Sequence, residues 1–269
     1  MVRIEQVTKV FHPREVNEVT AVDHVTLRVS PGEFVVIIGG NGSGKSTLMN
    51  LVAGSFLPDS GRIVIAGTDC TQMPEHARAA MLGRVFQDPL MGTAAGLTVE
   101  ENFALAASRG EFRGLGPALN STLRSEIRER LSLLEMGLED RLRARVGLLS
   151  GGQRQAITIL MAVFKQPRVL LLDEHTAALD PKVSQKIMAL TRRIVSESGL
   201  TTLMVTHNLS HALDTADRLV MMNRGVVAQE LGRDELRKMT VKDLLELFWV
   251  TQSRDDDGAP RSERAADQA

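Results

Sequence analysis

The chain contains a single cysteine, and its acidic and basic residues almost cancel. One cysteine, Cys70, excludes an internal disulfide and a zinc site made of several cysteines, so we expect a reducing compartment. A net charge of -1, from 32 basic and 33 acidic residues, gives no bulk attraction to nucleic acid or to an anionic membrane surface. We therefore expect no nucleic-acid partner, and any partner must be recognised by local features.

Long hydrophobic runs are also missing. No stretch approaches the ~18 consecutive apolar residues that a membrane-spanning helix requires, and residues 1–5 lack the apolar core of a signal peptide. If the protein works at a membrane, we expect another chain to hold it there. With 269 residues, of which 43% are hydrophobic and 24% charged, the chain is long enough for one large domain with or without an inserted subdomain.

Short apolar runs bounded by turn residues predict strands at residues 25–29, 34–38 and 62–66. Residues 169–172 and 203–205 are continuous apolar runs, which are typical of parallel strands buried on both faces. Between them, residues 181–198 are predicted to form a helix with Asp180 as its cap and Gly199 at its end. This order of strand, helix and strand indicates an α/β fold.

Two further regions have helical periodicity. From about residue 98 to residue 137 apolar residues recur at helical spacing, and Thr98 and Glu101 have the spacing of a capping box. A last helix is predicted to begin at Thr240, which pairs with Asp243 in the same way. We expect its apolar face to dock on the body of the domain; this face comprises Val241, Leu244, Leu245, Phe248 and Trp249.

A glycine-rich segment follows the predicted strand at 34–38 and matches the GxxxxGK[ST] pattern of a phosphate-binding loop. Glycines let successive backbone N–H groups converge on phosphate oxygens, and the helix that follows adds its dipole. Lys45 supplies a positive charge for the β- and γ-phosphates, and Ser46 supplies an oxygen for Mg²⁺. The segment comprises Gly39, Gly40, Asn41, Gly42, Ser43, Gly44, Lys45, Ser46 and Thr47.

Two acids, Asp173 and Glu174, end the apolar run at 169–172. Ligands of α/β sheets bind at the carboxyl ends of strands, so these carboxylates should lie near the phosphate loop. Asp173 is placed to hold Mg²⁺, directly or through water. Glu174 is then available to orient and deprotonate the attacking water.

A second helix start, with the sequence LSGGQ at residues 149–153, suits another anion site. Ser150 and Gln153 have capping-box spacing, while Gly151 and Gly152 expose backbone N–H groups. Together with the phosphate loop and LLLDE at residues 170–174, this segment resembles the nucleotide-binding subunits of ATP-binding cassette (ABC) transporters. LSGGQ is specific to that superfamily, and the three motifs occur in its order.

The resemblance implies roles for four other residues. Gln87 is similar to the glutamine that senses Mg²⁺ and the reacting water, and Asp180 to the aspartate of the D-loop. His207 resembles the switch histidine that contacts the γ-phosphate, and Phe11 the aromatic residue that stacks on adenine. The chain also departs from the family pattern, because Gly40 and His175 stand where proline is usual.

The fold that the resemblance implies is an α/β, P-loop NTPase core of the ABC type with a mixed sheet and an antiparallel β subdomain. Residues 1–252 form this ATPase domain, with a helical subdomain inserted at about 87–149, and residues 253–269 are expected to be a disordered charged tail. Two copies of the chain would enclose ATP and Mg²⁺ and drive a separate permease, which residues 88–106 would contact. The expected location is the cytoplasmic face of the membrane.

Segments 173–181, 203–208 and 239–245 resemble one branch of importers, sometimes described as tryptophan or tyrosine uptake systems, that work with an extracytoplasmic substrate-binding protein. An exporter subunit remains the alternative. DNA-repair ATPases of this superfamily carry long coiled coils that are missing here, translation-associated ATPases fuse two cassettes, and P-loop kinases and GTPases have no use for LSGGQ.

Removal of the residues after Gln252 should leave folding and ATP hydrolysis intact, because the polar tail has little apolar surface to bury. Thermal unfolding and ATPase assays of the shortened chain check this expectation. A large fall in melting temperature would show that the tail packs on the domain.

Overall fold

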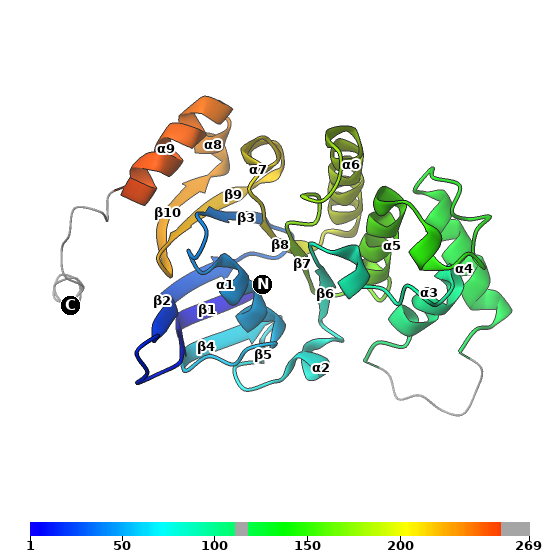
Figure 1. Ribbon diagram of the computed structural model, residues 1–269, viewed down its shortest axis with the longest axis horizontal. Coiled ribbons are helices and arrows are strands. Elements are labelled where there is room, and N and C mark those ends of the chain that lie inside the picture. The colour runs from blue at the N-terminus through cyan, green and yellow to red at the C-terminus, as the bar shows by residue number, and fades with distance from the viewer. Residues whose placement is uncertain (111–117, 254–269) are drawn as a thin grey trace.

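The protein is described by a computed structural model covering residues 1–110 and 118–253. Two β-sheets lie side by side, with helices arranged around them (Figure 1). The smaller sheet is antiparallel, in the order β2-β1-β4-β5. Its strands are β1 (Val2–Phe11), β2 (Val19–Val29), β4 (Ser60–Ile65) and β5 (Thr68–Asp69).

The larger, core sheet has the order β10-β9-β3-β8-β7-β6. All neighbouring pairs are parallel except β9 and β10, which run antiparallel, so the sheet is mixed. This confirms the predicted fold class. The strands are β3 (Phe34–Gly39), β6 (Leu82–Val85), β7 (Val169–Asp173), β8 (Thr201–Val205), β9 (Arg218–Asn223) and β10 (Val226–Gly232).

Both faces of the inner strands β3, β7, β8 and β9 are buried, and alternate residues of each strand point to opposite faces. Along β3, Val35 and Ile37 pack with α1 and the antiparallel sheet, whereas Val36 and Ile38 pack with α3, α4, α5 and α6. The sheet therefore separates the helix of the phosphate loop from the helix that begins at LSGGQ. The longer helices are α1 (Lys45–Ala53), α3 (Val99–Ala107), α4 (Ser121–Ser132), α5 (Gly151–Val163), α6 (Pro181–Ser198), α7 (Leu209–Thr215) and α9 (Val241–Ser253).

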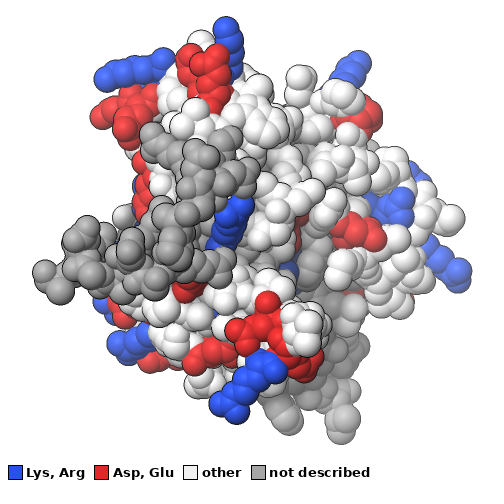
Figure 2. Space-filling model, turned by 60° about the vertical axis from the view of Figure 1, so that its left-hand side comes forward, with Lys and Arg blue, Asp and Glu red and all other residues white. Residues whose placement is uncertain are grey.

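Short helices complete the described part of the chain. They are α2 (Glu75–Arg78), η1 (Pro89–Met91), η2 (Val146–Leu148) and α8 (Arg233–Leu236). Between β6 and α5 the described residues form η1, α3, α4 and η2 with turns between them, and α3 and α4 lie in the region of predicted helical periodicity. No helix among the described residues is long and apolar enough to span a bilayer. Figure 2 shows basic and acidic side chains interspersed over one face of the molecule, without a large field of one sign.

The helix caps confirm the predictions made from local sequence. Thr98 and Glu101 form a capping box at α3, and Asp180 accepts a hydrogen bond from the N–H of Val183 (3.0 Å) at the start of α6. Gly199 ends that helix in the left-handed conformation (φ 59°), which costs glycine little. Each cap depends on residues within three or four positions, and this is why sequence alone locates it.

The prediction for the apolar face of the last helix is wrong in part. The capping box of Thr240 and Asp243 is present, but Val241, Leu245 and Trp249 are exposed. The buried face is centred instead on Leu244 and Thr251, which are spaced seven residues apart. The inward residues Leu244, Leu247, Phe248 and Thr251 have the spacing i, i+3, i+4 and i+7, and residues 241, 245 and 249 lie to one side of that face. The predicted tail lies outside the described residues, except Ser253, which ends α9.

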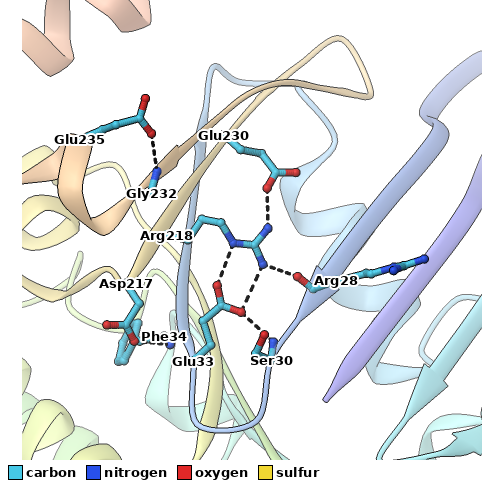
Figure 3. Close-up of polar contacts among 9 residues, drawn as sticks. All are labelled: Arg28, Ser30, Glu33, Phe34, Asp217, Arg218, Glu230, Gly232 and Glu235. Carbon is cyan, nitrogen blue, oxygen red and sulfur yellow. Dashed lines mark hydrogen bonds and ion pairs between the residues drawn. The ribbon is translucent and has the colours of Figure 1, made fainter. Parts of the chain in front are cut away.

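An ion-pair network at the amino end of β9 joins the two sheets (Figure 3). Arg218 pairs through its Nε with Glu33 Oε1 (2.8 Å), pairs with Glu230 on β10, and donates to the backbone carbonyl of Arg28 on β2. Glu33 also accepts from the N–H of Ser30 (2.7 Å). Burial raises the pKa of Glu33, but the hydrogen bonds from Arg218 and Ser30 outweigh it, so the net pKa is lowered.

The network predicts a pH-dependent contribution to stability. Because the pKa of Glu33 is lower in the folded than in the unfolded chain, its stabilisation is present above its ordinary pKa of 4.5 and is lost as the pH falls below that value. Glu33→Gln should reduce the free energy of unfolding by about 1–3 kcal/mol at neutral pH, and the difference from wild type should narrow on acidification.

Denaturant unfolding at a series of pH values measures both effects. Glu246→Gln is the control, because this exposed acid on α9 makes only a long contact with Lys242 (3.8 Å). A difference between wild type and Glu33→Gln that stays constant with pH would contradict the expectation.

Candidate functional site

The phosphate loop joins the carboxyl end of β3 to the first turn of α1. Two of its glycines are required by close approach: a Cβ at Gly39 would lie 2.4 Å from the Met222 carbonyl oxygen, and one at Gly44 would lie 2.3 Å from that of Ala21. Gly44 also has a φ of 98°, which side chains rarely adopt. The loop is therefore fixed against β9 on one side and β2 on the other.

Lys45 is buried at the base of this loop. Its ammonium group donates to the carbonyl oxygens of Gly39 (2.9 Å) and Gly40 (2.8 Å). Burial lowers the pKa of Lys45, and the negative charges of Glu174 and Asp173 act in the opposite direction. The predicted cation and the two predicted acids therefore lie close enough for their charges to interact.

Asp173 is the last residue of β7. Burial raises the pKa of its carboxyl group, and the charges of Arg84, Lys45 and His207 oppose that rise. Arg84 was not predicted from sequence. It lies on β6 and donates to Asn50 of α1 (2.6 Å), so it links the outer strand of the sheet to the helix of the phosphate loop.

Glu174 has a positive φ of 43°, an uncommon and strained conformation for a residue with a side chain. Its N–H donates to the Val205 carbonyl (2.9 Å), and its Oε1 lies 2.5 Å from Nε2 of His207. The two side chains line a cavity of about 430 Å³ that also reaches the start of α6. The predicted base and the predicted switch residue therefore contact each other directly.

His175, noted above as a departure from the family pattern, is fully buried behind Glu174. Thr191 on α6 donates its hydroxyl to the Ile187 carbonyl (2.8 Å), so it accepts from Nε2–H of His175 (3.2 Å). Burial, assisted by the charge of His211, lowers the pKa of His175 to about 3, and the ring is neutral near pH 7. His175 therefore anchors the strained turn to α6.

The LSGGQ segment begins α5 with the predicted capping box: Gln153 N–H donates to Ser150 Oγ (3.3 Å), and Ser150 N–H donates to Gln153 Oε1 (3.2 Å). Gly151 and Gly152 occupy the first turn, where backbone N–H groups have no partner within a helix. A Cβ at Gly152 would lie 2.6 Å from Cγ1 of Val183, so this glycine permits the close approach of α5 to α6.

Three other predicted residues belong to elements that precede or follow the core strands. Gln87 is exposed two residues after β6, and Ser46 is exposed in the first turn of α1. Phe11 ends β1 and packs edge-on against Phe56, with 5.3 Å between ring centroids. Among the described residues no group of three or more His, Cys, Asp or Glu side chains is arranged to hold a metal ion. One carboxylate with hydroxyl and amide oxygens fits Mg²⁺, a hard cation that retains water and binds phosphate.

A strand, a glycine-rich loop and a helix placed beside acids at strand ends define a P-loop nucleotide-binding domain. The sequence model of one protein family, described as ABC transporter, matches residues 22–177. The tyrosine transport ATP-binding protein of Clostridioides difficile is 41% identical over 248 residues, with 92% of this chain and 98% of that protein covered.

Other relatives and solved structures agree. The sulfate/thiosulfate import ATP-binding protein CysA of Synechococcus elongatus is 38% identical over 85% of this chain, which spans 61% of that protein. A solved ATP-binding cassette in a dimeric, post-hydrolysis state with ADP and Pi is 30% identical, with a TM-score of 0.74 and coverage of 87% of this chain and 99% of that one. An ADP-bound cassette of an ABC transporter is 25% identical, with a TM-score of 0.76 and coverage of 93% and 98%. The chain belongs to the ABC transporter family and is an ATP-hydrolysing cassette.

Glu174→Gln should bind ATP but hydrolyse it at least ~100-fold more slowly, because the attacking water loses its base while the phosphate contacts remain. Phosphate-release assays and calorimetry measure the two properties separately. Glu197→Gln, an exposed acid at the far end of α6, is the control and should hydrolyse normally. Normal turnover by Glu174→Gln would refute its assignment as the base.

Proposed function

We propose that this chain is the ATPase subunit of an amino-acid importer and that two copies share two ATP sites. The observation that carries the proposal is the position of α5 relative to α1. The two helices pack on opposite faces of the core sheet, so the helix start at Ser150 and the phosphate loop belong to different layers of one molecule.

A twofold dimer brings the two elements together. If the phosphate loop of one chain faces LSGGQ of its partner, the same symmetry places the partner's loop against the first chain's LSGGQ. The N–H groups at the start of α5 would then approach the γ-phosphate from the side opposite Lys45. ATP binding would close the dimer and hydrolysis would release it, which gives a motor with two states.

The proposal gives each site residue a role. Lys45 and the loop amides bind the β- and γ-phosphates, and Phe11 stacks on adenine. Glu174 takes a proton from the attacking water, and His207, which lies against it, contacts the γ-phosphate. Bound Mg²⁺ neutralises phosphate charge, and Ser46, Asp173 and Gln87 are the residues that would hold it.

The proposed permease contact is the segment at residues 88–106. It includes three exposed apolar side chains, Leu90, Met91 and Leu105, in the part of the chain between β6 and α4. Exposed apolar side chains are candidates for a contact surface with another protein. The chain would bind the cytoplasmic face of the permease, and the permease would receive its solute from an extracytoplasmic binding protein. The names of the relatives support import, and the tyrosine relative supports an amino acid as solute.

The shared-site proposal is tested with purified heterodimers that carry Glu174→Gln in both chains, so that bound ATP stays trapped. A dimer of one Lys45→Ala chain and one Ser150→Ala chain has both lesions in one site and an intact second site. It should trap ATP in that second site. A dimer of one doubly mutated chain and one chain without either lesion has one lesion in each site, and it should trap little.

If each site were formed by the loop and the LSGGQ segment of the same chain, the expected results would be reversed. The dimer with the doubly mutated chain would then trap ATP, and the other dimer would trap little. ATP trapped only by the dimer with the doubly mutated chain would therefore exclude the shared-site dimer.

A further inference from the structure

The last turn of α9 lies against the phosphate loop, about 210 residues away along the chain. A Cβ at Gly40 would lie 3.0 Å from Oε1 of Gln252, and Nε2 of Gln252 donates to the Met222 carbonyl (3.4 Å). Gly40 is absent from the glycines with positive φ, so its backbone conformation does not demand glycine. The missing side chain at residue 40 instead provides the space in which Gln252 sits.

A second set of contacts connects the same parts through the turn between β9 and β10. The Gly225 N–H donates to the Ser43 carbonyl of the phosphate loop (3.0 Å). On the other side of this turn, Nδ2 of Asn223 donates to the Thr251 carbonyl of α9 (3.1 Å). The turn, the loop and the end of α9 are thus joined in one hydrogen-bonded unit, and Figure 1 shows α9 on the side of the core sheet formed by β9 and β10.

Gln252 differs from the other inward residues of α9 in the kind of contact that it makes. Leu244 and Thr251 are buried and Leu247 and Phe248 pack against the hydrophobic core, whereas Gln252, which is half-buried, makes a polar contact with the Met222 carbonyl. The contact that distinguishes this side chain from its neighbours on α9 is the one with Gly40.

We propose that Gln252 is a positioning residue of the ATP site, which holds the first part of the phosphate loop in the shape that receives the phosphates. It acts through Gly40 and the Met222 carbonyl and does not itself bind ATP. The proposal rests on the proposed function of the loop as the ATP site.

The direct test is Gln252→Ala in the full-length protein without nucleotide. Hydrogen exchange of the backbone amides at residues 40–43 should become faster, while exchange elsewhere and the melting temperature stay unchanged. In the same variant the dissociation constant for ATP should rise about threefold to tenfold, a range expected for the loss of one positioning contact. Gln72→Ala, an exposed glutamine near β5, is the control and should change neither quantity.

A double-mutant cycle identifies the contact. Gly40→Ala and Gln252→Ala should have non-additive effects on ATP affinity, because the methyl group at residue 40 already disturbs the side chain that the second substitution removes. Additive effects would show that the two residues act independently and would overturn the proposal.

Hydrogen exchange and ATP binding together distinguish failure of the proposed role of Gln252 from failure of the proposed function of the loop. Unchanged exchange at residues 40–43 in Gln252→Ala, in a protein whose wild type binds ATP, overturns the positioning role alone. Faster exchange in that variant, together with equal ATP binding by wild type and Lys45→Ala, supports the contact and refutes the loop as the ATP site.

Discussion

Burial of both faces of the core sheet is the constraint on which the other features depend. A parallel strand in such a sheet presents mostly apolar side chains to both sides, so charged groups that must reach a ligand are favoured at its ends. In β7 this confines the carboxylates to Asp173 and to Glu174 just beyond it. Because β3, β7 and β8 are parallel neighbours, their carboxyl ends place the phosphate loop, the acids and His207 at one edge. The same burial separates α1 from α5.

The electrostatics of that edge follow from its partial desolvation. Burial works against the charged forms of both Lys45 and Asp173, lowering the pKa of the first and raising that of the second. The charge of each group counteracts the effect of burial on the pKa of the other. The cost of desolvating Lys45 and Asp173 together is therefore lower than the cost of desolvating each one alone. Such a site suits a phosphate chain with a bound metal ion. Lys45 would then bind phosphate oxygens, and Asp173 would bind the metal ion.

The parts of the fold that sequence predicts are those set by short-range patterns. Caps at Thr98, Ser150 and Asp180 involve residues three positions apart, and the apolar runs of β3, β7 and β8 identify buried strands. The motifs likewise locate the candidate site. Sequence could not give the burial of α9, whose apolar residues surround more of the helix than one face and whose orientation is set by β9 and α7. It also missed Arg84, because an arginine within a strand carries no motif.

The two departures from the family pattern coincide with two of the long-range contacts that the sequence could not reveal. A Cβ at residue 40 would lie 3.0 Å from Oε1 of Gln252, and His175 has a side-chain N–H, which proline lacks, that reaches Thr191 on α6. In both cases a local rigid residue is replaced by one that depends on a contact from another element. Without proline the backbone is less restricted locally, and its conformation depends more on tertiary contacts. The geometry of the loop and of Glu174 thus becomes sensitive to how α9 and α6 are packed, a dependence that a proline at either position would not create.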